Sequence, residues 1–236
     1  MSIRNKKVIL RYSIIGIFIL ISAIFGKDVI DNNKEVTTVE SNNTLSDIPE
    51  YVKEPYTKIA NGLSNFTEKE KSILELETYS SDNMGRCTTA FALITKDTMP
   101  TEERGAIGMV KPTGWQTIKY DFISGKYLYN RCHLIGFQLA GENANEENLI
   151  TGTRYLNIEG MLPFENMVAD YIKETNNSVL YRVTPIYTDS NLIADGLTIE
   201  AYSVEDQGDG INFYVYCYNV QPGVIINYED GSSKAE

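Results

Sequence analysis

The sequence predicts an α+β domain with a central antiparallel β-sheet and flanking helices. Three stretches, 179–188, 192–204 and 211–220, alternate apolar and polar residues, which is typical of strands in such a sheet. The 16 Tyr and 8 Phe favour a strand-rich domain with a core filled by aromatic side chains. One apolar stripe at helical spacing, over Phe164, Val168, Tyr171 and Ile172, predicts a helix that covers the sheet. This composition argues against a helix-only architecture.

Residues 1–27 have the pattern of an export segment. Four basic residues lie among the first eleven, and an uncharged run over 12–26, rich in Ile, Leu and Phe, follows them. No clean small-x-small cleavage site follows, and with 8–10 included the run approaches a membrane span. A cleaved signal peptide and an uncleaved membrane anchor therefore both stay open. Either one places the rest of the chain outside the cytoplasm, secreted or anchored to the outer face of the cytoplasmic membrane.

The remaining chain divides into a polar linker over 28–50, a folded domain over 51–230 and a frayed tail over 231–236. Within the domain, Thr67 and Glu70 form a capping-box pattern that predicts a short helix. A buried strand is expected over 87–95. Because Gly208-Asp209-Gly210 is a turn signal, it separates the last two strands.

The only histidine, His133, ends one arm of a predicted β-hairpin, 117–121 and 126–134 around 122–125. A single imidazole excludes a zinc site with several histidines and a histidine pair that shares acid and base work. In a hydrolase that works near neutral pH, His133 is the natural general base.

Three cysteines without any Cys-x-x-Cys spacing argue against a structural zinc site. Cys87 and Cys217 both fall in expected strands. A disulfide between them is open in an exported protein, and so is the reading that both are small buried residues. Cys132, beside His133, is a weak candidate for a nucleophile, because the lone histidine would have to serve it.

The stretch Asn130-Arg131-Cys132-His133, followed by Asn157 and Glu165, resembles the Asp-Arg-Gly-His signature of the DNA/RNA non-specific endonuclease family. The family has the ββα-metal (His-Me finger) fold. The resemblance is strongest to secreted or membrane-anchored streptococcal nucleases and DNA-entry nucleases, and it covers about residues 85–228. It implies that the predicted hairpin is the ββ part and that the following helix carries Asn157. Asn130 and Cys132 depart from the signature, and a glycine needed for positive φ is not replaced without strain.

The resemblance also assigns roles to the site residues. His133 activates water, Arg131 pairs with the phosphate or the transition state, and Asn148 supports the site. Asn157 binds one Mg²⁺, for which Mn²⁺ can substitute, and Glu165 orders the water shell of the metal. Arg154 and Arg182 are weaker candidates for substrate binding. Simpler readings exist as well: Asn157 as a helix cap, Glu165 as a first-turn acid, and the two arginines as structural ion-pair partners.

Together these residues predict an extracytoplasmic, metal-dependent, non-specific endonuclease that hydrolyses DNA, and the resemblance implies products with 5′-phosphates. Whether RNA is also a substrate stays open. The net charge of −11 argues against tight binding of a polyanion, but cleavage needs positive charge only at the scissile phosphate. The alternative is a catalytically inactive surface-binding module of the same fold.

Overall fold

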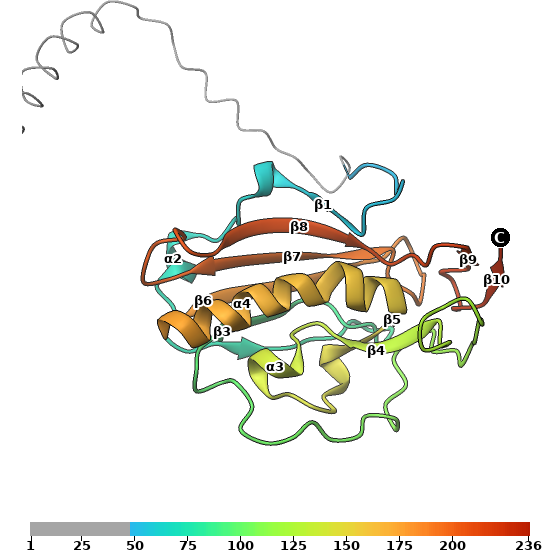
Figure 1. Ribbon diagram of the computed structural model, residues 1–236, viewed down its shortest axis with the longest axis horizontal. Coiled ribbons are helices and arrows are strands. Elements are labelled where there is room, and N and C mark those ends of the chain that lie inside the picture. The colour runs from blue at the N-terminus through green and yellow to red at the C-terminus, as the bar shows by residue number, and fades with distance from the viewer. Residues whose placement is uncertain (1–47) are drawn as a thin grey trace, which may run out of the picture. The chain divides into compact units, whose positions relative to one another are not determined.

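The computed structural model describes residues 48–236 (Figure 1). The predicted export segment and residues 28–47 of the predicted linker lie outside this range. Within it, Ile48 already packs against the domain, next to Tyr51 and Tyr218. No helix among residues 48–236 has the length and hydropathy needed to cross a bilayer.

The main sheet has six antiparallel strands in the order β1-β8-β7-β6-β3-β2. The antiparallel sheet predicted from the alternating stretches is thus confirmed, with each strand shorter than its stretch. All eight residues of β7 are buried, because both faces of the sheet are covered. The strands are β1 (Tyr56–Lys58), β2 (Glu77–Thr78), β3 (Ala90–Ile94), β6 (Val179–Ile186), β7 (Gly196–Ser203) and β8 (Asn212–Tyr218).

Helix α4 (Leu162–Thr175) crosses one face of this sheet (Figure 1). Its apolar stripe, with Phe164, Val168 and Ile172, joins the main core cluster against the strands, as the sequence predicts. Burying each such side chain contributes about 1.5–3 kcal/mol to folding. The opposite face carries a smaller cluster that includes Phe66, Leu180 and Tyr202.

A separate two-stranded ribbon precedes α4. Strand β4 (Tyr129–His133) pairs antiparallel with β5 (Leu149–Thr153), so that His133 lies opposite Leu149. The predicted partner of β4 was wrong: residues 117–121 make only one bridge, Lys119 to Tyr127, and do not form the second strand. The strand β5 instead supplies a row of five buried residues, which a short solvent-exposed hairpin does not offer.

The chain after β5 stays helical from Leu156 to Thr175. A π-helix, η4 (Leu156–Met161), runs directly into α4, and Asn157 lies in its first turn. Neither Gly160 nor Pro163 interrupts this helical stretch. Pro163 lies at the start of α4, where its missing N–H costs little. Gly160 lets η4 pack on β8, since an added Cβ would lie 3.4 Å from Cys217 Cβ.

The remaining elements are short: η2 (Ala60–Gly62), α2 (Glu68–Lys71), α3 (Phe137–Ala140), η3 (Glu146–Asn148), β9 (Val224–Ile226) and β10 (Ser233–Ala235). The capping box at the start of α2 is confirmed. The expected fraying of the tail is wrong, because β10 pairs with β9.

All three cysteines are free and buried. Cys87 lies against the start of β5, with its Sγ 3.2 Å from the Leu149 carbonyl oxygen. Cys217 lies against η4, with its Sγ 3.5 Å from the Gly160 carbonyl oxygen. The disulfide that the sequence left open is therefore absent.

Candidate active site

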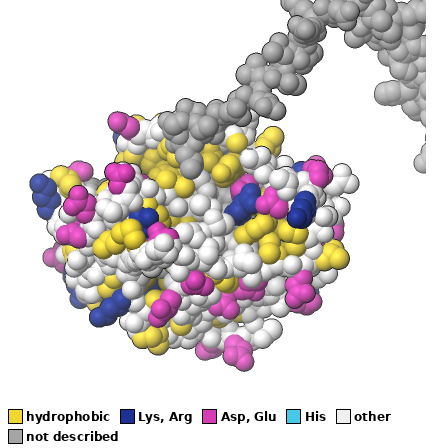
Figure 2. All heavy atoms as spheres, turned by 180° about the vertical axis from the view of Figure 1, so that it is seen from behind, with side chains coloured by type: hydrophobic (Ala, Val, Ile, Leu, Met, Phe, Trp, Pro, Cys, Tyr) yellow, Lys and Arg dark blue, Asp and Glu magenta, His cyan; other side chains and the backbone are white. Residues whose placement is uncertain are grey.

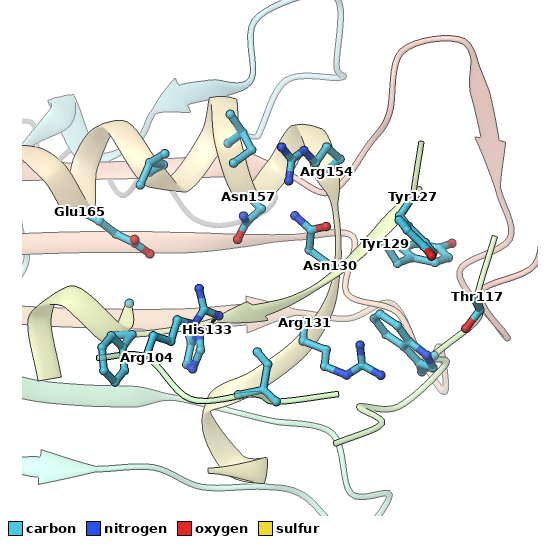
Figure 3. Close-up of a pocket in the computed structure, with 16 residues that line it drawn as sticks. Arg104, Thr117, Tyr127, Tyr129, Asn130, Arg131, His133, Arg154, Asn157 and Glu165 are labelled. Carbon is cyan, nitrogen blue, oxygen red and sulfur yellow. Dashed lines mark hydrogen bonds between the residues drawn. The ribbon is translucent and has the colours of Figure 1, made fainter. Parts of the chain in front are cut away.

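A pocket of about 700 Å³ opens between β4, the η4–α4 helix and the loop that contains Arg104 (Figure 3). Five of the predicted site residues line it: Arg131, His133, Arg154, Asn157 and Glu165. In Figure 3, Asn157 and Glu165 extend from the helix toward the strand that carries His133. Asn148 and Arg182 do not line the pocket.

The surroundings of His133 determine which ring nitrogen carries the proton. Its Nε2 lies 2.8 Å from the backbone oxygen of Asn143, which only accepts, so Nε2 donates. Its Nδ1 lies 3.2 Å from Nη2 of Arg104, which only donates, so Nδ1 accepts. Burial, and secondarily the charge of Arg104, lower the pKa of His133, although the hydrogen bond to Asn143 opposes this. The neutral imidazole is therefore the favoured form near pH 7.

Asn148 acts on the chain that follows His133. It is fully buried, its Oδ1 accepts from the Ile135 N–H at 2.9 Å, and its Nδ2 donates to the Ile135 oxygen at 3.0 Å. The backbone of Leu134 also donates to the Asn148 oxygen at 2.9 Å. These three bonds hold the turn at the end of β4 in place. Asn148 thus supports the site without touching the pocket.

Glu165 lies in a cradle that the sequence does not reveal. Its carboxylate rests against Gly136, the residue before α3, where an added Cβ would lie 2.5 Å from Oε2 and 2.9 Å from Oε1. Burial raises the pKa of Glu165 to about 7, with opposing effects from Gln138 and Arg104. Gly136 therefore leaves room for the carboxylate, and no side chain larger than hydrogen fits there without displacing it.

The donor groups in the pocket fit a hydrated divalent cation. No cluster of three or more His, Cys, Asp or Glu side chains that could enclose a metal occurs in residues 48–236. The pocket instead offers two amide oxygens, from Asn130 and Asn157, and one carboxylate, from Glu165. Mg²⁺ keeps most of its water ligands when it binds a protein. A few protein oxygens are therefore enough to hold it, and an all-protein cage is not needed.

Arg131 is engaged with the loop in front of it. Its Nε donates to the Val110 carbonyl oxygen, its Nη2 donates to the Gly108 oxygen at 2.9 Å, and its guanidinium lies 3.9 Å from the Trp115 ring centroid. These contacts use two of its five N–H groups and one face. These contacts hold Arg131 against the loop, and because it lines the pocket with three N–H groups left over, its pairing with phosphate stays a prediction. Trp115 packs there and is not a free stacking surface.

Arg104, which the sequence reasoning missed, and Arg154 have guanidiniums open to a ligand. Arg104 contacts Nδ1 of His133 and forms no ion pair within the described residues. Arg154 lines the pocket and forms no ion pair within the described residues. The alternative that Arg154 is a structural ion-pair partner therefore has no support. The clustering of basic residues in the sequence is the signal that could have identified Arg104 as a candidate site residue. Within 104–131, the basic residues are Arg104, Lys111, Lys119, Lys126 and Arg131, and the only acid is Asp121.

Arg182 lies on the other face of the sheet. Its guanidinium pairs with Glu70 and, at 2.7 Å, with Glu200, and it lies over the rings of Phe66 and Phe91. Figure 2 views the molecule from behind, and there the basic side chains are interspersed with acidic ones. The structure therefore does not bring Arg182 to the pocket.

The structure accommodates Asn130 and Cys132, the two residues that depart from the endonuclease signature. Cys132 lies inside β4 with negative φ, so no glycine conformation is needed there. Its Sγ fills the space that a side chain on Gly152, in the neighbouring strand, would occupy. Burial raises the pKa of the Cys132 thiol well above its usual value, which excludes it as a thiolate nucleophile. Asn130 lines the pocket.

Several solved nuclease structures have a fold similar to that of this chain. NucA from Streptococcus agalactiae with a magnesium ion bound has a similar fold, with a TM-score of 0.72 and 23% identity over 82% of this chain and 94% of that one. The Sda1 nuclease with a bound zinc ion gives a TM-score of 0.58 and 28% identity over 68% and 81%. An extracellular endonuclease gives 0.54 and 18% over 79% and 100%.

The family match covers the site itself. The model of the DNA/RNA non-specific endonuclease domain matches residues 66–205, which include β4, β5, η4 and α4. That range is more than half of the chain, and it contains His133, Asn157 and Glu165. This chain therefore belongs to the DNA/RNA non-specific endonuclease family and acts on nucleic acid.

Proposed function

We propose that this endonuclease uses the Nδ1 lone pair of His133 as the general base that activates water against a phosphodiester. The observation that carries the proposal is the fixed tautomer: Nε2 donates to the Asn143 oxygen at 2.8 Å, which leaves Nδ1 as the acceptor in a pocket shared with Asn157 and Glu165. Because burial lowers the pKa of His133, most of the imidazole is neutral at pH 7.

Arg104 would have two positions during turnover. Before substrate binds, its guanidinium caps Nδ1 of His133 at 3.2 Å. A phosphate, with its negative charge, is a stronger partner for a guanidinium than a neutral imidazole nitrogen. Arrival of the scissile phosphate would therefore draw Arg104 away and release the lone pair for water. Arg154, which lines another part of the same pocket, would neutralise a second phosphate oxygen or a neighbouring phosphate.

The residues that would hold a divalent cation are Asn157, as a direct ligand, and Glu165, through hydrogen bonds to the water shell. When bound, the cation supplies charge stabilisation at the phosphate and at the leaving 3′ oxygen. The magnesium bound to NucA and the zinc bound to Sda1 support a divalent ion. Amide and carboxylate oxygens favour Mg²⁺ or Mn²⁺, since zinc prefers nitrogen and sulfur ligands.

The protein would work outside the cytoplasm. The charged and apolar segments at 1–27 support export, and an extracellular endonuclease is among the similar structures. The domain organisation in this proposal is an export or anchor segment, a linker and a catalytic domain that starts near residue 51.

Incubation of the full-length protein with plasmid, single-stranded DNA and RNA tests the function. Each substrate is combined with Mg²⁺, Mn²⁺, Zn²⁺ or EDTA, and products are resolved on gels and probed for 5′-phosphate ends. We expect Mg²⁺- or Mn²⁺-dependent cleavage of DNA with little sequence preference, abolished by EDTA. Intact plasmid with every metal would instead support the inactive binding module.

A further inference from the structure

The pocket continues away from His133 into a second arm, lined by Thr117, Tyr127, Tyr129 and Arg154. Figure 3 shows Thr117, Tyr127 and Tyr129 at the end of the pocket opposite Glu165 and Arg104, with Arg154 between Tyr127 and Asn157. Of these four, only Arg154 has a role in the chemistry proposed above, as a partner of a phosphate. Because Tyr127 lies six residues from His133 along an extended chain, at most about 20 Å separate them. The arm is therefore within a few nucleotides of the cleavage point.

The aromatic residues of the arm differ in how available they are. Tyr129 is buried and its hydroxyl donates to the Gly231 oxygen at 2.9 Å. Tyr127 is 46% exposed, and its hydroxyl bonds to nothing within the described residues. The ammonium of Lys119 lies 4.5 Å from the centroid of the Tyr127 ring. Lys119 thus covers one face of the Tyr127 ring, and burying the area of the ring that stays exposed would be favourable.

The charge of the arm suits a phosphate chain. Arg154 forms no ion pair in residues 48–236, and its Cζ would lie 3.9 Å from a Cβ on Gly125, at the turn beside Tyr127. The surrounding segment 104–131 carries five basic residues against one acid in a protein of net charge −11. An unpaired guanidinium next to an exposed ring is the combination that holds a backbone phosphate and stacks a base.

We propose that this arm is a nucleotide subsite, in which Tyr127 stacks an unpaired base while Arg154 binds the adjoining phosphate. The proposal deepens the function above, because it rests on nucleic acid entering the same pocket. The whole pocket, including the part around His133, measures about 700 Å³, so its arm has room for about one nucleotide. A base has a free face for Tyr127 only when it is unpaired. The enzyme therefore holds single-stranded or frayed substrate more tightly than intact duplex.

Binding without cleavage tests the subsite. In full-length protein carrying His133→Ala, with EDTA present, fluorescence anisotropy measures the Kd of a labelled single strand, its duplex and an abasic strand of equal length. We expect Tyr127→Ala to raise the Kd of the single strand roughly 5- to 100-fold. Tyr127→Ala should raise the Kd of the duplex less. It should leave the Kd of the abasic strand unchanged, because that strand keeps its charge but has no base. Tyr127→Phe and Tyr127→Trp restore the affinity.

Phe122→Ala is the matched control, because Phe122 is 59% exposed near the same turn but does not line the pocket. It leaves all three Kd values unchanged. The subsite is overturned if Tyr127→Ala behaves like Phe122→Ala, if it weakens abasic and normal strands equally, or if Tyr127→Phe fails to restore binding. Wild-type plasmid cleavage is assayed in parallel. Failure of that assay alone would reject the catalytic proposal and leave the binding result standing.

Discussion

The two faces of the main sheet use arginine in opposite ways. On the outer face, Arg182 is enclosed by Glu70 and Glu200 and by two phenylalanine rings. On the pocket side, Arg104 and Arg154 have no carboxylate partner among the described residues. A neutralised guanidinium holds the fold together, whereas an unpaired one attracts an anion.

This difference explains how a protein with a net charge of −11 can act on a polyanion. In the rest of the chain acids outnumber basic residues, whereas 104–131 has five basic residues and one acid, and Arg104, Arg131 and Arg154 line the pocket. A cleft lined by one sign of charge raises the local concentration of substrate, even when the whole molecule has the opposite sign. Catalysis then needs only local attraction, and weak overall binding favours product release.

The largest effect is expected from His133→Ala on the pocket side. Loss of the general base should reduce kcat by about 10²–10⁴-fold while the fold and metal binding remain, because the metal is assigned to Asn157. Imidazole added to the variant should partly restore the rate. Asn157→Ala is the control: activity falls, and imidazole has no effect. Steady-state kinetics with and without imidazole make the measurement, and an unchanged rate in His133→Ala would end the mechanism.

Gly136→Ala should cost roughly 10- to 100-fold in activity or in metal affinity, because the new methyl group displaces the Glu165 carboxylate. The metal concentration that gives half the maximal rate, and the metal-induced rise in Tm, both report the change. Gly108→Ala is the matched control, since a Cβ there meets nothing within 4 Å. Combining Gly136→Ala with the shorter Glu165→Asp should recover part of the loss. If Gly136→Ala and Gly108→Ala need the same metal concentration and show the same metal-induced rise in Tm, Gly136 does not position the Glu165 carboxylate.

The pH dependence of kcat/KM should contain the ionisation of His133, below the ordinary His pKa of about 6.5, besides that of Glu165, whose pKa burial raises to about 7. Burial lowers the pKa of His133, and Arg104 adds to this, so the base loses activity only in acid, about tenfold per pH unit. Because the unfolded chain binds this proton more readily, the free energy of unfolding also falls as pH drops through the same window. Arg104→Ala should move the midpoint of kcat/KM upward. A His133 pKa at or above 6.5, followed by NMR of its ring protons, would contradict the assignment.

Arg104→Ala and Arg154→Ala should each weaken binding by several-fold and make it less dependent on salt. For duplex DNA, the slope of log K against log salt should become shallower by about 0.9 for each lost phosphate contact. Binding titrations from 50 to 200 mM salt make the measurement. Lys111→Ala, at an exposed position outside the pocket lining, is the comparison. An unchanged slope in Arg154→Ala would remove that residue from the substrate path.

The smallest effect on activity is expected on the outer face. Arg182→Leu leaves Glu200, which is 4% exposed, without its partner, and should destabilise the fold by about 3–5 kcal/mol. The value of kcat/KM at a temperature where the variant is folded should stay within about twofold of wild type. Adding Glu200→Leu should restore part of the stability, since the unpaired charge is gone. A large loss of kcat/KM in folded Arg182→Leu would contradict the conclusion that Arg182 stabilises the fold without a part in catalysis.

The sequence by itself determined the features that depend on local pattern. Alternation identified the strands β6, β7 and β8, the helical stripe identified α4, and the Thr67–Glu70 pair identified the capped turn. The spacing of His133, Asn157 and Glu165 also sufficed to indicate the family, because the ββα unit lies almost contiguously in the chain.

Only the tertiary structure decided which distant groups meet. The strand partner of β4, the cradle of Gly136 against Glu165 and the contact of Arg104 with His133 join residues 16–29 positions apart through a folded loop or helix. Arg131 and Arg182 look alike as charges in sequence, yet one binds a loop and the other lies between two glutamates across the sheet. The physical reason is that hydrophobic periodicity orients a side chain only toward core or solvent. The identity of its partner depends on packing between segments that are far apart in the chain.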